Sequence, residues 1–155
     1  MPLASSARPL HPLERLEWVA AGLGCAVLLA LHAPDVRWGP FVLLFAAVDL
    51  LGYLPGAVLA RRGAVPRWAF ALYNLAHSAL THVVVVGLWW AVAGRPEWAL
   101  LALPLHLACD RGLLGNGLKS PGEPFTPGSR AVPARPGDVA LPLGWPLVAP
   151  ARRAA

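Results

Sequence analysis

The sequence predicts an all-α, polytopic membrane protein, in which a four-transmembrane-helix bundle is followed by a disordered, proline-rich C-terminal tail. Two observations predict this class. Hydrophobic residues make up 57% of the 155-residue chain and charged residues only 14%, against about 25% charged residues in soluble domains. The apolar residues also come in long blocks whose few charges lie mostly at the block ends. Lipid is the natural solvent for such blocks.

Four apolar blocks are each long enough to cross a bilayer. About 20 helical residues at about 1.5 Å per residue cover a hydrocarbon core of about 30 Å. The predicted spans are residues 16–33, 41–60, 68–93 and 97–114, within a transmembrane domain of residues 16–118. The Gly-Asn-Gly stretch at 115–117 ends the last span, because glycine tolerates positive φ. Residues 1–15 form a short cytoplasmic segment, and prolines keep the tail of residues 119–155 from forming a long helix.

The arginines and lysines predict the orientation of the chain. Four spans place only Arg37 and Arg95 on one side of the membrane. The other side then carries most of the membrane-flanking basic residues, namely Arg8, Arg15, Arg61, Arg62, Arg67, Arg111 and Lys119. The basic side is expected to be cytoplasmic, so both termini face the cytoplasm from the inner cell membrane. The net charge of +5 is then a topology signal, and no nucleic-acid partner is expected. Tryptophans near the predicted span ends support the boundaries: Trp18, Trp38, Trp68 and Trp98.

Ionisable side chains inside the predicted spans are the candidate functional residues, because each is costly in lipid. Asp49, His77, His106 and Asp110 fall at similar depths near the predicted midplane. Residues three or four apart share a helix face, which groups each of them with polar neighbours on its own span. Five neighbours are expected to support the site: Tyr53, Tyr73, Asn74, Ser78 and Arg111. His82 lies about 140° around the helix from His77 and is left out of the cluster.

A structural explanation competes with the functional one. Buried polar residues in membrane bundles often hydrogen-bond across helices and stabilise packing by about 0.6 to 2 kcal/mol each. Two carboxylates and two imidazoles at one depth are more ionisable chemistry than packing requires, which favours a site.

Three motifs occur in order along the chain: YNLAH at 73–77, HLACDR at 106–111 and LGNGLK at 114–119. Together with Asp49 and the following Gly-Tyr-Leu at 52–54, they resemble a family of small bacterial integral membrane proteins, domain of unknown function family 4260. The resemblance covers residues 15–119. It implies a four-helix membrane domain and no reaction, and it marks Asp49, Tyr73, Asn74, His77, His106, Asp110 and Lys119.

The sequence leaves three functions open, and whether the protein is an enzyme is undecided. The first is a membrane-embedded metal-dependent hydrolase, in which His106, Asp110, His77 and Asp49 supply three or four ligands to a divalent metal. The second is a membrane protein that handles protons or small solutes, for which a homo-oligomer is expected. The third is a non-catalytic module whose tail binds a cytoplasmic partner or anionic lipid. The bilayer is a partner in all three.

Overall fold

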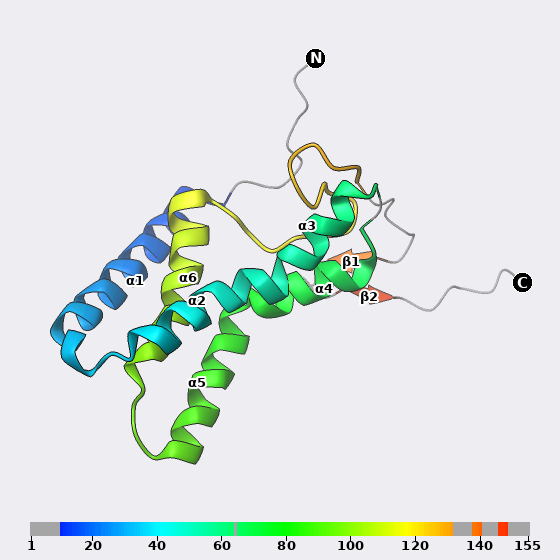
Figure 1. Ribbon diagram of the computed structural model, residues 1–155. Helices are drawn as coiled ribbons and strands as arrows, with labels where there is room; N and C mark the ends of the chain where they lie inside the picture. The colour runs from blue at the N-terminus through cyan, green and yellow to red at the C-terminus, as the bar shows by residue number, and fades with distance from the viewer. Residues whose placement is uncertain (1–9, 64, 132–137, 141–145, 149–155) are drawn as a thin grey trace, which may run out of the picture.

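The computed structural model describes residues 10–63, 65–131, 138–140 and 146–148, and these are helical apart from connecting loops and one small hairpin. The elements in chain order are α1 (Pro12–Leu31), η1 (Ala33–Asp35), α2 (Trp38–Gly52), α3 (Leu54–Arg61), α4 (Arg67–Ala76), α5 (Ala79–Ala93), η2 (Trp98–Leu101), α6 (Ala102–Ala108), η3 (Cys109–Leu114), β1 (Asp138–Ala140) and β2 (Pro146–Val148). Figure 1 shows α1 beside α6, α2 passing next to α6, and α5 pointing away from the rest. The predicted all-α class is confirmed for the described helical region.

The first helix, α1, has clear start and stop signals. His11 lies at the N-cap, where its side chain accepts a hydrogen bond from the Leu13 N–H, and Pro12 occupies the first helical position. The helix ends at Leu31, shortly before Pro34. It therefore begins four residues earlier than the predicted span of residues 16–33.

The second apolar block forms α2 and α3, which together run from Trp38 to Arg61. Pro55 lies in the first turn of α3 and has no N–H to donate to the preceding turn, which accounts for the interruption at Tyr53. The helical nature of the predicted span 41–60 is confirmed.

The third apolar block is not one continuous helix, so the prediction of an unbroken helix over residues 68–93 is wrong. Helices α4 and α5 meet at a bend of 54°, with the break at His77 and Ser78. Side chains satisfy the carbonyl groups that the break releases. His82 Nε2 lies 2.8 Å from the Ala76 oxygen, and Arg111 Nη2 donates to the His77 oxygen at 2.9 Å. Neither proline nor glycine marks this break, which is why the sequence pattern conceals it.

The fourth block is helical throughout but changes its winding. A 3₁₀ turn, η2, leads into α6, and the π-helical turn η3 completes the stretch. Pro104 has no N–H to donate within this stretch, which favours irregular winding nearby. Gly115 then ends the helix with a φ of +74°, as predicted for the Gly-Asn-Gly stretch.

One helix among the described residues, Trp38–Arg61, is long and apolar enough to cross a membrane. Helices α4 and α5 provide a second candidate if the bent pair acts as one span. The predicted bundle of four spans is therefore not confirmed. In α1, Glu14, Arg15 and Glu17 leave an uncharged stretch of only about 14 residues, roughly 21 Å of helix.

The beginning of the predicted disordered tail is ordered, and that part of the prediction is wrong. Residues 115–131 return across α3 and α4 (Figure 1), and Phe125 in this segment is fully buried beside Gly56. Prolines exclude a long helix, but they do not exclude a loop that packs through its side chains. Strands β1 and β2 pair antiparallel, with Val139 opposite Leu147. The rest of the predicted tail, and residues 1–9, lie outside the described residues.

Two clusters of buried apolar side chains hold the helices together. The first joins α4 to the 115–131 loop and contains Val65, Ala69, Phe70, Tyr73 and Phe125. The second joins α2 to η2 and α6 and contains Val48, Leu100 and Leu103. The polar residues near the α4–α5 break lie next to both clusters, because Tyr73 belongs to the first and Ala76 packs against the second.

Candidate functional site

Two imidazoles and two carboxylates converge in the bundle. His77 lies at the α4–α5 break, His106 on α6, Asp49 on α2 and Asp110 in η3. The Nε2 atom of His77 lies 3.4 Å from Asp49 Oδ1 and 3.3 Å from Asp110 Oδ2. The Nε2 atom of His106 lies 3.8 Å and 3.7 Å from the same two oxygens. The side chains that were predicted to lie at similar depths therefore meet, and we call these four residues the His/Asp cluster.

A backbone carbonyl orients the His77 ring. Its Nδ1 atom lies 2.9 Å from the Tyr73 oxygen, and because a carbonyl only accepts, Nδ1 carries the proton of the neutral ring. Nε2 then presents a lone pair to two carboxylates, which are also acceptors. The ring stacks on Tyr73, with centroids 4.0 Å apart and an interplanar angle of 16°. A histidine oriented in this way through its other nitrogen is typical of a metal ligand.

Three of the four histidine nitrogens of the cluster are buried and unsatisfied. Both ring nitrogens of His106 and Nε2 of His77 have no hydrogen-bond partner in the described part of the chain. The side chains of His77 and His106 are only 3% and 5% exposed. An unsatisfied buried polar atom costs about 1–3 kcal/mol. A metal ion or a shared proton between the four groups would remove that cost.

The π-helical turn η3 and Asn116, two residues after its end, position Asp110. Asn116 Nδ2 donates to Asp110 Oδ1 at 3.3 Å, and the Asn116 N–H donates to the Asp110 backbone oxygen at 2.8 Å. The other carboxylate oxygen, Oδ2, is then directed to His77 and His106. Short π-helical segments occur frequently at functional sites.

The cluster is open on the side of Asp49. The Asp49 side chain is 55% exposed, whereas that of Asp110 is 13% exposed. Along α2, Leu50 and Leu51 follow Asp49 directly and are also exposed. The opening of the cluster therefore lies among apolar side chains.

Three residues of the cluster have the geometry of a metal-ligand set. One ligand atom from each of Asp49, His77 and His106 lies within 4.8 Å of the other two. Atoms bound at about 2.1 Å to a tetrahedral ion lie about 3.4 Å apart, so small side-chain movements would complete the site. Asp110 provides a further carboxylate 3.3 Å from His77 Nε2.

Most of the predicted supporting residues contact the cluster or its neighbours. Tyr73 stacks on His77 and contacts Tyr53, with ring centroids 6.4 Å apart. Arg111 Nη2 donates to the His77 carbonyl, and its guanidinium carbon lies 4.5 Å from the Trp18 ring centroid. Ser78 is the N-cap residue of α5, but its side chain makes no capping hydrogen bond. The structure thus brings Tyr53, Tyr73 and Arg111 to the site and gives Ser78 only a backbone role.

Asn74 and Lys119 connect the site to the 115–131 loop. Asn74 Nδ2 donates to the Lys119 oxygen at 2.7 Å, and the Lys119 N–H donates to Asn74 Oδ1 at 2.8 Å. The Lys119 ammonium lies over the rings of Tyr73, Phe125 and Tyr53, at 4.9, 5.4 and 5.9 Å from their centroids. Burial lowers the pKa of Lys119, while the nearby carboxylates of Asp110 and Glu123 oppose that shift.

Comparison with known proteins gives no independent assignment. No family model, curated protein or solved structure matches this chain. The resemblance to domain of unknown function family 4260 therefore stays a prediction from the three motifs.

Sequence reasoning missed two residues that shape the site. His82 is buried, and its contact with the Ala76 carbonyl stabilises the broken end of α4; a continuous helix gave no reason to assign it this role. Asn116 orients Asp110, and its place next to two glycines suggested only a helix end. The presence of a second histidine in an apolar block is the one sequence signal that could have identified His82.

Proposed function

We propose that the protein is an integral membrane protein of the inner membrane whose polar cluster lies within the bilayer. Large apolar side chains point outward while the histidines point inward, the reverse of the arrangement in a soluble bundle. Leu43, Leu88 and Val92 are 71%, 62% and 88% exposed, whereas His77, His82 and His106 are buried. Four passes with cytoplasmic termini remain part of this proposal, as does membership of domain of unknown function family 4260.

The same proposal assigns the His/Asp cluster to one divalent metal ion, with Asp49, His77 and His106 as protein ligands. The observation that carries it is the buried, unsatisfied Nε2 of His77, which faces two carboxylates. Mutually facing acceptors repel unless a cation lies between them. Two imidazoles and a carboxylate suit zinc, iron or manganese.

Hydrolysis is the reaction that this ligand set supports best. Three protein ligands leave a position for water, and a divalent metal lowers the pKa of bound water to about 7. A metal ion held by Asp49, His77 and His106 would supply an activated water. Asp110 Oδ2 would hold the proton taken from that water and return it to the leaving group when the scissile bond of the substrate breaks. Asn116 keeps the carboxylate of Asp110 oriented during both transfers.

Metal analysis of the full chain purified in detergent tests this assignment. The protein and the variants Asp49→Asn, His77→Gln and His106→Gln are incubated with zinc, manganese or iron(II), desalted, and measured by plasma mass spectrometry. We expect about one equivalent in the unaltered protein and less than about one-tenth of it in each variant, since a lost ligand commonly costs more than tenfold in affinity. His32→Gln is the matched control, because His32 stacks on Trp98 outside the cluster. A metal-free protein after all three incubations would refute the metal site.

Proton handling is the second candidate. Asp49, His77, Asp110 and His106 form a continuous series of titratable groups with contacts of 3.3 to 3.8 Å, and imidazole and carboxylate groups suit proton relays in membranes. This function predicts proton flux into vesicles that contain the purified protein, unchanged by chelators and lost in His77→Gln. If the same variants instead lose the circular dichroism signal of the folded protein, the cluster serves helix packing.

A further inference from the structure

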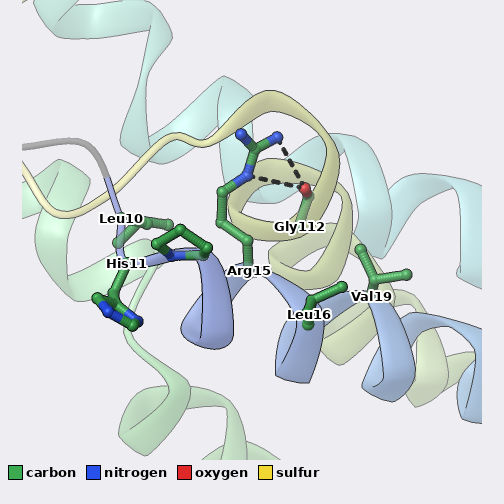
Figure 2. Close-up of a pocket in the computed structure, with 7 residues that line it drawn as sticks. Leu10, His11, Arg15, Leu16, Val19 and Gly112 are labelled. Carbon is green, nitrogen blue, oxygen red and sulfur yellow. Dashed lines mark hydrogen bonds between the residues drawn. The ribbon is translucent and has the colours of Figure 1, made fainter.

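Two adjoining grooves follow α1 on the side that faces α6 and η3. The first has a volume of about 740 Å³ and is lined by residues including His11, Arg15, Val19 and Gly112 (Figure 2). The second, of about 190 Å³, begins at Val19 and continues along Trp18 and Leu23 of α1. Val19 lines both grooves, so they adjoin at this residue, and we call the pair of grooves the path along α1.

Hydrogen-bond donors lie at the end of this path near the start of α1. Arg15 Nε and Nη2 donate to the Gly112 oxygen at 3.3 and 3.1 Å, and Nη2 also donates to the Leu113 oxygen at 3.0 Å. Figure 2 shows the guanidinium crossing to the end of η3. Its other amino group, Nη1, has no hydrogen bond or ion pair in the described part of the chain. His11 Nδ1 accepts from the Leu13 N–H, so Nε2 carries the ring proton of neutral His11.

The other end of the path is apolar. Its exposed surface is almost entirely carbon. Residues of α1, α6 and η3 line it, among them Gly22, Leu23, Leu105, Ala108, Cys109 and Leu113. Small residues bring the two walls together. A Cβ atom on Gly22 would lie 3.1 Å from Ala108 Cβ, and one on Gly112 would lie 3.0 Å from the Val19 nitrogen.

We infer that this path binds a phospholipid with an anionic headgroup. The phosphate contacts Arg15 Nη1, and one acyl chain lies along the apolar groove beside Trp18 and Leu23. From Arg15 to Leu23 the helix rises about 12 Å, which is part of the length of one acyl chain. The inference rests on the membrane location proposed above and is independent of the metal site.

Charge and position favour a lipid over another occupant. The carboxylates of the same helix, Glu14 and Glu17, do not line either groove, so the cationic guanidinium defines the polar end. Arg15 lies on the predicted cytoplasmic side, where the leaflet is rich in anionic lipid. A polar end joined to an apolar path parallel to a helix matches the headgroup and chain of one lipid, and arginine binds phosphate through paired N–H groups.

Native mass spectrometry of the full chain, extracted from nanodiscs of phosphatidylcholine and phosphatidylglycerol in equal amounts, tests the inference. We expect one retained lipid per protein, with phosphatidylglycerol enriched about tenfold, as one charge-assisted contact supports. Arg15→Gln should abolish the enrichment, and Leu23→Trp should remove the retained lipid by filling the apolar groove. Arg61→Gln, at an exposed arginine at the end of α3, and Leu31→Trp, at the exposed end of α1, are the matched controls and should behave like the unaltered protein.

Several results would overturn the inference. Equal retention of the two lipids would remove the headgroup site. Loss of enrichment in Arg61→Gln as strong as in Arg15→Gln would indicate a diffuse charge effect. Because Arg15 also caps η3, Leu23→Trp tests the groove if Arg15→Gln fails to fold, and normal lipid retention in Leu23→Trp would refute it. A protein that retains lipid but binds no metal would separate this inference from the proposed metal site.

Discussion

At the scale of single residues, the amide of Asn74 fixes the start of the loop that covers the bundle. It both donates to and accepts from the Lys119 backbone, in the way one strand pairs with another. Asn74 is 3% exposed, so water cannot replace either bond. The position of Lys119 above the Tyr73 ring, and hence the positive charge near the cluster, depends on this amide.

Replacing Asn74 with alanine should therefore destabilise the protein. The Lys119 N–H and C=O groups would lose their partners, and the expected loss in free energy of unfolding is about 1–3 kcal/mol. Thermal unfolding in detergent, followed by circular dichroism, measures the change. Leu75→Ala is the control, because Leu75 is the next residue of α4 and is half-exposed. Equal midpoints for Asn74→Ala and Leu75→Ala would contradict the role of the amide.

At the scale of elements, a glycine permits the close approach of α2 to the α4–α5 break. A Cβ atom on Gly52 would lie 2.7 Å from Ala76 Cβ and 3.1 Å from two atoms of the His77 ring. No side chain other than hydrogen fits there unless a helix moves. The distance between Asp49 and His77 thus depends on a residue that has no functional group.

The substitution Gly52→Ala should weaken both the fold and the site. Moving α2 away from α4 is expected to cost about 1–3 kcal/mol of stability, as overpacking generally does, and to reduce the metal content measured as above. Gly24→Ala is the matched control: no atom lies within 4 Å of its added Cβ, and alanine in a helix interior should stabilise by up to about 1 kcal/mol. A Gly52→Ala protein as stable as Gly24→Ala would show that α2 is free to shift.

The elements also show what the sequence can and cannot predict. Residue spacing was sufficient to place His106 and Asp110 on one helix face, because i and i+4 positions share a face whatever the larger fold. Matching depths in the predicted spans were sufficient to add Asp49 and His77 to this pair. The end of η3 at Gly115 could likewise be predicted from neighbouring residues alone. The break at His77 was not, since it depends on His82 and on Arg111 from a distant segment. The ordered loop around Phe125 likewise depends on the notch at Gly56, more than 60 residues away along the chain.

At the scale of the whole molecule, one ion pair joins two distant loops. Arg37, just before α2, contacts Glu97, just before η2, with Nη2 and Oε2 2.6 Å apart. Glu97 also accepts from the Ala99 N–H and so caps η2. The hydrogen bond from Arg37 is the main cause of a Glu97 pKa below the ordinary value of 4.5.

The sign of this shift predicts acid sensitivity. A carboxylate with a lowered pKa stabilises the folded protein fully above its ordinary value, and the contribution is lost as pH falls through the lowered pKa. The side chain of Arg37 is 58% exposed, so the loss should not exceed about 1 kcal/mol, as for surface pairs. Unfolding midpoints measured from about pH 6 to about pH 3 should fall less steeply in Arg37→Gln. Glu17→Gln, at an exposed glutamate of α1, should keep the slope of the unaltered protein.

The exposure of Asp49 among leucines has a kinetic consequence for the proposed hydrolase. A substrate that reaches the cluster past Leu50 and Leu51 arrives from the plane of the bilayer, so the concentration that governs its rate is the mole fraction in the lipid. Diluting such a substrate with inert detergent would slow turnover even at constant total concentration. Dilution with water alone would not slow turnover, because the mole fraction of the substrate in the lipid would stay the same.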